Sequence, residues 1–148
     1  MYCTRTQAIL LSCLMLLATL LSSCDPSSCG CAPPPAPHVT AAQLLHKWQQ
    51  SELQVGTPSV VVRDNDIKNR YAIEFRTDGT YTQTLLADNT TYTGTWMLMD
   101  PDNRMLHLTD QKGDIQEYTI ISVSDQTLAY SRPNKAGQQE YYSFKLVY

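Results

Sequence analysis

The chain has 148 residues and a formal net charge of -3, a length that allows one domain with accessory segments. This mild charge, together with the lack of a basic stripe in the sequence, argues against nucleic acid as a partner. All five cysteines lie within the first 31 residues, so disulfides cannot staple a domain formed by the rest of the chain.

Residues 1–23 read as a signal peptide. Arg5 gives a positive start, and Ala8 to Leu21 is an apolar run too short to span a bilayer comfortably. The run ends in Leu21-Ser22-Ser23-Cys24, which resembles the lipobox of bacterial lipoproteins. The resemblance implies that Cys24 becomes the lipidated mature N-terminus and anchors the chain in a membrane. An ordinary secretory signal and an uncleaved anchor are the alternatives.

The lipobox resemblance places the protein in the bacterial cell envelope. Asp25 directly follows the lipidated position and resembles an inner-membrane retention signal of some Gram-negative lipoproteins. That rule is not general across bacteria, so the choice of membrane stays open, and we favour the outer membrane.

Residues 24–39 form a proline-rich stretch that predicts a semi-rigid, lipidated tether. Cys29 and Cys31 lie within it, and we interpret them as exposed cysteines oxidised together. A further lipid or half of a metal site are the other readings, although a closed zinc site needs about four ligands and only His38 is near.

Residues 40–148 predict a single β domain that begins with a short helix over Thr40–Trp48. Thr40 can cap this helix, with Gln43 in the capping-box position, and Leu44 and Trp48 share an apolar face. We expect the helix to plug or flank one end of the domain.

The stretch from Tyr71 to Leu98 carries the clearest strand signal. Apolar side chains alternate with polar ones from Tyr71 to Phe75, which is the pattern of a half-buried strand. Asp78-Gly79 is typical of a tight hairpin turn, and Asp88-Asn89 marks a second hairpin. Gly94 indicates a bend where the backbone and a ring approach closely.

Further short strands, almost all joined by tight turns, are expected at Gln50–Val55, Ser59–Arg63, Met105–Thr109, Ile115–Val123, Thr127–Ser131 and Tyr141–Val147. Tight sequential connections imply an antiparallel meander, and closing a long meander removes its exposed edges. The sequence therefore predicts an all-β fold, a small antiparallel up-and-down β-barrel of about eight or nine strands with a short N-terminal helix. A two-sheet sandwich is the alternative.

Four motifs are similar to those of lipocalin-like domains in bacterial envelope lipoproteins: the helix leading to Lys47-Trp48, the Phe75–Tyr81 hairpin, Gly94-Thr95-Trp96, and the closing strand Tyr142–Leu146. The similarity covers about residues 40–148. It implies a small up-and-down barrel that binds, at most, a small apolar molecule.

The sequence shows no catalytic constellation. Its histidines are His38, His46 and His107, and no serine lies in a Gly-x-Ser-x-Gly elbow. The segment Asp64-Asn65-Asp66 lacks the central glycine of a calcium loop. We therefore expect neither enzymatic activity nor a cofactor, and we read His107 and Glu117 as water-facing.

Strand alternation also predicts which side chains face the barrel interior. Besides Ile73, Leu98, Leu106, Ile120, Leu128 and Tyr142, the inward set contains the candidate ligand-binding residues Phe75, Tyr92, Trp96, Leu108, Tyr118, Tyr130 and Phe144. A barrel of about eight strands can either fill with such side chains or hold one small ligand. Trp96 is predicted to be a core anchor.

Three functions fit these expectations. The first is a lipid-anchored protein that carries or senses a small hydrophobic ligand. The second is an accessory or inhibitor lipoprotein that binds another envelope protein through its outer face, where Met97 and Met99 are the best candidates for an apolar patch. The third is a hydrolase or isomerase built in the barrel. A cavity above roughly 300 Å³ would favour the first.

Overall fold

The computed structural model describes residues 38–148, which belong to one compact unit, Ala36–Tyr148. The expected lipidation site Cys24 and the tether cysteines Cys29 and Cys31 lie outside the described residues.

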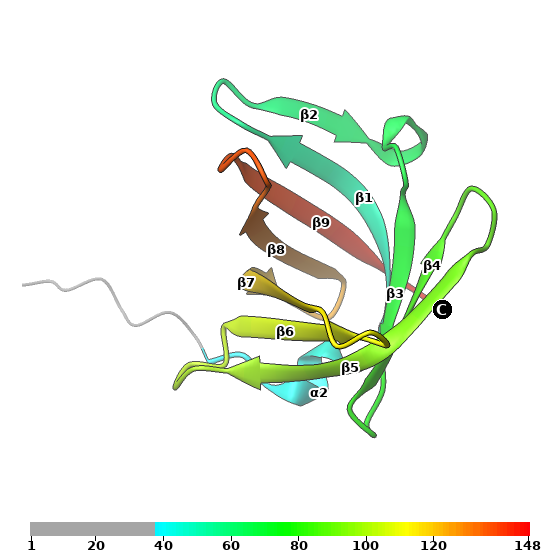
Figure 1. Ribbon diagram of the computed structural model, residues 1–148, viewed down its shortest axis with the longest axis vertical. Coiled ribbons are helices and arrows are strands. Elements are labelled where there is room, and N and C mark those ends of the chain that lie inside the picture. The colour runs from blue at the N-terminus through cyan, green and yellow to red at the C-terminus, as the bar shows by residue number, and fades with distance from the viewer. Residues whose placement is uncertain (1–37) are drawn as a thin grey trace, which may run out of the picture. The chain divides into compact units, whose positions relative to one another are not determined.

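The unit consists of strands joined by short turns, preceded by one turn of helix (Figure 1). The elements in chain order are α2 (Ala41–Leu44), β1 (Lys47–Val55), β2 (Val60–Arg63), the 3-10 turn η2 (Asp64–Asp66), β3 (Tyr71–Phe75), β4 (Thr80–Leu85), β5 (Thr91–Met99), β6 (Met105–Asp110), β7 (Ile115–Val123), β8 (Thr127–Pro133) and β9 (Gln139–Val147).

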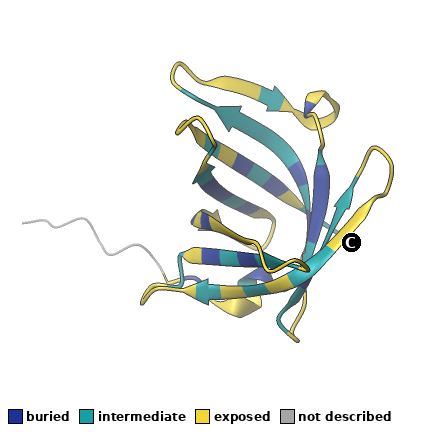
Figure 2. Cartoon of the chain, viewed as in Figure 1, coloured by how far each residue is buried: buried dark blue, intermediate teal, exposed yellow. Residues whose placement is uncertain are grey.

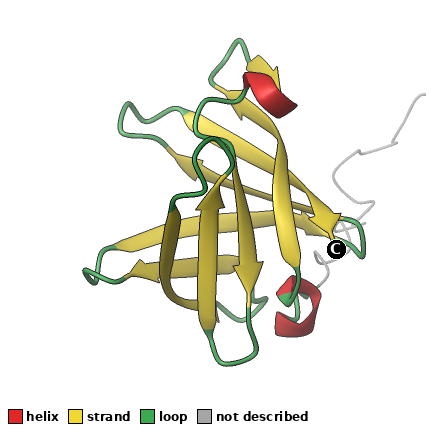
Figure 3. Cartoon of the chain, turned by 90° about the vertical axis from the view of Figure 1, so that its right-hand side faces the viewer, coloured by secondary structure: helices red, strands yellow, loops and turns green. Residues whose placement is uncertain are grey.

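All strands pair antiparallel in the order β2-β1-β3-β4-β5-β6-β7-β8-β9, and β1 also pairs with β9. The last pairing closes eight strands, β1 and β3 to β9, into a barrel (Figure 3). Strand β2 is an additional strand at its edge, beside β1 (Figure 1). The predicted all-β up-and-down barrel is therefore confirmed, and the two-sheet sandwich is excluded.

Strand β1 pairs with β9 along one edge, and along its other edge it pairs with two strands in turn, β3 and then β2. Its first residues pair with β3 as far as Gln49 opposite Ala72, and its last residues, from Glu52 to Val55, pair with β2. At the division, the backbone oxygen of Gln50 accepts a hydrogen bond from Nε of Arg70 at 2.7 Å. The same guanidinium donates to Asn65 and Asp64 of the η2 turn. Arg70 thus connects β1 to the η2 turn where β3 has separated from it.

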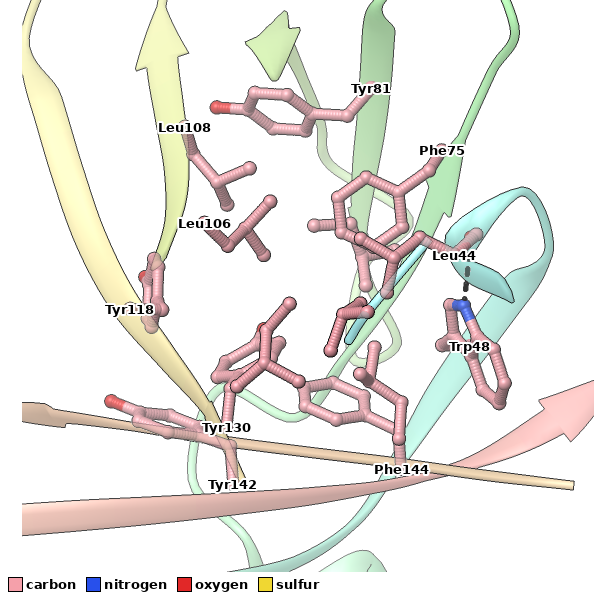
Figure 4. Close-up of a cluster of buried hydrophobic side chains, with 14 of the residues drawn as sticks. Leu44, Trp48, Phe75, Tyr81, Leu106, Leu108, Tyr118, Tyr130, Tyr142 and Phe144 are labelled. Atoms are coloured by element: carbon pink, nitrogen blue, oxygen red, sulfur yellow. Dashed lines mark hydrogen bonds between the residues drawn. The ribbon is translucent and has the colours of Figure 1, made fainter. Parts of the chain in front are cut away.

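The predicted helix is shorter than expected, because Trp48 lies in β1. Trp48 pairs with Ile73 on one side and Leu146 on the other, and it is fully buried. Its indole Nε1 donates to the backbone oxygen of Leu44 at 3.1 Å (Figure 4). Because the chain is already extended at Lys47, the helix has only one turn. Its buried Leu44 joins the hydrophobic core, as expected of a helix that plugs one end.

The predicted cap of this helix is present. The backbone N–H of Thr40 donates to Oε1 of Gln43 at 2.8 Å, the capping-box contact that the sequence indicated.

The hydrophobic core contains most of the predicted inward-facing residues. Figure 2 marks the buried positions along the strands, and Figure 4 shows a cluster of the buried side chains. The predicted members that are buried are Ile73, Phe75, Leu106, Leu108, Tyr118, Ile120, Leu128, Tyr130, Tyr142 and Phe144. A buried aromatic chain connects Tyr118, Tyr130 and Phe144, with ring centroids 4.7 and 4.9 Å apart.

Trp96, predicted to be a core anchor, is only half-buried at the edge of this core. Its ring packs edge-on against Phe75, with centroids 5.4 Å apart, and its Nε1 donates to the backbone oxygen of Arg76 at 3.1 Å. The indole nitrogen finds its partner in the β3–β4 turn, which keeps the ring at the rim. Trp48, which the sequence had placed in a helix, is the buried tryptophan of the core.

Gly94 lies where the sequence indicated a close approach. A Cβ atom at this position would lie 2.1 Å from the backbone oxygen of Thr109 and 2.8 Å from the Tyr81 ring. Only glycine therefore allows β5, β6 and the Tyr81 ring to pack at their present separation.

The outer face of β5 to β7 carries both apolar and polar side chains. Met97 is paired in register with His107, and His107 with Glu117, whose carboxylate lies 3.0 Å from Nε2 of the histidine. His107 faces outward as expected, but its side chain is only 17% exposed, so it is covered more than a free surface histidine would be.

Candidate functional site

One end of the barrel contains a cavity of about 520 Å³, within the usual size range of small-molecule sites. We call this the open end. It is lined by Gln50, Leu53, Lys68, Asn69, Tyr71, Tyr81, Gln83, Leu85, Tyr92, Asp110, Gln116, Tyr118, Arg132, Glu140 and Tyr142.

The cavity lies where the inward-facing pattern of six strands, β1, β4 and β6 to β9, changes from apolar to polar. Toward the open end, Leu108 of β6 is followed two positions on by Asp110, and Tyr130 of β8 by Arg132. The same change occurs from Trp48 to Gln50 in β1, Tyr81 to Gln83 in β4, Tyr118 to Gln116 in β7 and Tyr142 to Glu140 in β9. Apolar residues thus fill the other half of the barrel, and polar residues keep this half solvated.

A pair of tyrosines separates the cavity from the core. Tyr71 lines the cavity, Tyr130 is fully buried beneath it, and their hydroxyl oxygens lie 2.7 Å apart. Burial raises the pKa of both hydroxyls well above the ordinary value. Both phenols therefore stay protonated at physiological pH.

Arg132 forms the polar wall of the cavity. Its Nη1 donates to Gln116 Oε1 at 2.9 Å and to the Tyr118 hydroxyl at 3.2 Å, and its guanidinium lies 5.2 Å from the centroid of the Tyr118 ring. Its Nε lies 3.6 Å from Oε2 of Glu140, which accepts a hydrogen bond from the Tyr142 hydroxyl. Burial also raises the pKa of Tyr118 and Tyr142, so both rings present neutral hydroxyls.

Gln50 differs from these wall residues because its side-chain oxygen has neither a hydrogen-bond partner nor an ion-pair partner among the described residues. The residue is 1% exposed, and its Oε1 is buried without a hydrogen bond from any residue between 38 and 148. Gln50 lies opposite Phe144 in the β1–β9 ladder, and therefore points into the barrel.

The structure divides the seven candidate ligand-binding residues between cavity and core. Tyr92 and Tyr118 line the cavity, Tyr92 at its mouth with 51% of its surface exposed. The remaining candidates do not line it: Phe75, Leu108, Tyr130 and Phe144 are packed in the core, and Trp96 borders a separate groove near α2. The sequence pattern predicted all seven as ligand-binding because strand alternation shows which side chains face the barrel interior. It does not show how far along the barrel axis each side chain lies.

Sequence reasoning missed the polar lining residues. Gln50, Gln83, Arg132 and Glu140 all continue an inward-facing alternation, so the signal was present in the sequence. The prediction counted only apolar positions as inward, whereas in six strands a polar residue at the next inward position marks the open end.

Neither a metal site nor a membrane-spanning helix is found in the part of the chain that the structure describes. Among residues 38–148, no three His, Cys, Asp or Glu side chains lie close enough together to hold a metal ion. No helix within the same residues has the length and apolarity needed to cross a membrane.

A comparison with protein families supports the reading of the fold. Residues 44–130, more than half of the chain, match the model of the lipocalin-like domain. The sequence matches no curated protein at a significant level. Lipocalin-like domains typically bind ligands and do not catalyse reactions, and a closed barrel with one solvated end has the geometry for such binding. The chain belongs to the lipocalin-like domain family.

Proposed function

We propose that this protein is a lipid-anchored lipoprotein of the bacterial cell envelope whose barrel binds a small hydrophobic molecule at the open end. The cavity of about 520 Å³ is the observation that carries the binding role. The lipobox-like Leu21-Ser22-Ser23-Cys24 supports the anchor. Of the two membranes, the outer one is the proposed location.

The side chains that line the cavity narrow the class of ligand that it can bind. The rings of Tyr71, Tyr81 and Tyr118 provide aromatic area, while hydroxyls, carboxamides and the Arg132 guanidinium provide hydrogen-bonding groups. A purely aliphatic molecule would displace water from these polar groups without offering them a new hydrogen bond, at a cost in binding free energy. The favoured ligand is therefore a small amphipathic ring compound.

A fluorescence titration tests the cavity directly. The neutral dye N-phenyl-1-naphthylamine should bind the purified protein in the micromolar range. Gln83→Trp should weaken binding about tenfold or more, because Gln83 lines the cavity and an indole there would occupy it. Met97→Trp adds the same ring on the exposed outer face and should leave the affinity unchanged.

The anchor has its own test. Cys24→Ala should abolish lipidation, so the variant should appear in the soluble fraction or keep its signal peptide. A processed variant that still fractionates with membranes at unchanged mass would contradict the role of Cys24.

A second function is favoured by the outer surface. Met97, Met99 and Met105 lie on the outer face of β5 and β6, and are 51%, 41% and 36% exposed. Flexible apolar side chains of this kind are suited to protein contacts. If the dye fails to bind the unmodified protein, the accessory or inhibitor role, with another envelope protein as partner, becomes the better account.

A further inference from the structure

The buried carboxamide of Gln50 is the least explained polar group of the barrel. Its Oε1 is out of contact with bulk solvent and receives no hydrogen bond from the rest of residues 38–148. A buried acceptor without a partner destabilises a fold, so such a group calls for a reason to be there. Gln50 lines the cavity, which makes a bound molecule the natural source of the missing donor.

The local structure of β1 fixes this side chain in place. Gln50 pairs with Phe144, and the register of the β1–β9 ladder shifts immediately afterwards, between Gln50 and Glu52. The backbone oxygen of Gln50 is already bound by Arg70 at 2.7 Å. The side chain therefore points inward from a backbone position that is held on both edges of the strand.

We propose that Gln50 determines the specificity of the cavity, and that it selects small uncharged ring compounds whose inserted end carries an O–H or N–H donor. This inference rests on the proposed ligand-binding function. A ligand with a donor at its inserted end gives Oε1 the hydrogen bond that the described residues do not supply, whereas a ligand without a donor leaves Oε1 unpaired.

The charges around the cavity favour an uncharged ligand. The lining contains the cations Lys68 and Arg132 and the anions Asp110 and Glu140, which balance one another. Burial raises the pKa of the hydroxyls of Tyr71, Tyr81, Tyr118 and Tyr142, so these groups remain protonated at neutral pH and add no charge. A charged ligand would lose its hydration without finding a net opposite charge in the cavity.

A pair of matched probes tests this selection. The compounds are 2-naphthol, which carries one O–H donor and is uncharged at neutral pH, and 2-methoxynaphthalene, which carries the same rings without the donor. Displacement of N-phenyl-1-naphthylamine from the full chain measures both affinities. Wild-type protein should bind 2-naphthol about tenfold or more tightly than the methyl ether, because only the naphthol supplies a donor.

Two variants assign the preference to one residue. Gln50→Met keeps the length of the side chain but removes the acceptor, so the preference for 2-naphthol should fall to about one while the methyl ether binds at least as well as before. Gln49→Met makes the same change at the neighbouring, half-buried position of β1, which does not line the cavity, and should keep the wild-type preference.

The outcomes separate the two proposals. If both probes bind the wild-type protein equally, or if Gln50→Met keeps the preference, the role of Gln50 is wrong while the cavity still binds ring compounds. If neither probe nor the dye binds, the proposed function itself is wrong. Thermal unfolding provides an independent readout, since removing an unpaired buried acceptor should leave the Tm of Gln50→Met unchanged or raise it.

Discussion

At the scale of single residues, the hydroxyl pair of Tyr71 and Tyr130 marks the border between the solvated and the dry half of the barrel. Each phenol has the other as its partner, at 2.7 Å. A core built only from aliphatic side chains would need no such pair. Here the hydrogen bond between the two hydroxyls allows aromatic rings to extend from the core to the cavity without leaving a buried hydroxyl unpaired.

The pair predicts a non-additive mutational response. Tyr71→Phe should destabilise the protein by about 1–2 kcal/mol, because it leaves the hydroxyl of the fully buried Tyr130 without a partner. Replacing both tyrosines by phenylalanine should cost less than Tyr71→Phe alone, because no unpaired hydroxyl remains. Urea denaturation of the two variants checks this. Equal additive losses would show that the hydrogen bond does not couple the two residues.

At the scale of elements, β5 depends on the small size of Gly94. The strand lies between β4 and β6, and a side chain at Gly94 would collide with the backbone of one neighbour and a ring of the other. The contact with Thr109 involves main-chain atoms, which cannot rotate away as a side chain could.

We predict that Gly94→Ala destabilises the barrel by about 3 kcal/mol or more, because overpacking against a backbone forces two strands apart. Thr95→Ala, at the exposed neighbouring position of β5, is the matched control and should change the free energy of unfolding by less than about 0.5 kcal/mol. The comparison is made by urea titration. Similar small losses in both variants would mean that β5 and β6 can separate without cost.

The strands themselves were predictable because their alternation and turns are local signals. Asp78-Gly79 and Asp88-Asn89 lie in the turns where hairpins were expected, and both Gly79 and Asn89 adopt positive φ angles. The helix was the exception. Its pattern favoured continuation to Trp48, but pairing with β3 and β9 extends that residue, and neither partner is near in the sequence.

At the scale of the whole molecule, barrel closure was predictable, whereas the position of the cavity was not. Closure follows from the number of strands and the cost of exposed edges. The cavity depends on how far along the barrel each inward-facing residue lies, and the stagger between strands sets that depth. This is why Tyr118 lines the cavity although Tyr130, on the next strand, lies below it.

The pairing of β1 with β9 has a consequence for the order in which the protein can fold. Every other pairing joins strands that follow one another or are separated by a single short strand, so hairpins can form as soon as they are made. Residues such as Trp48 and Leu146, by contrast, meet only across nearly the whole domain. Such a contact is slow to form, because a long loop must close before it gains any stabilisation. The barrel therefore cannot close until β9 is available to pair with β1, and until then the β9-facing edge of β1 remains open to water and to any other extended chain.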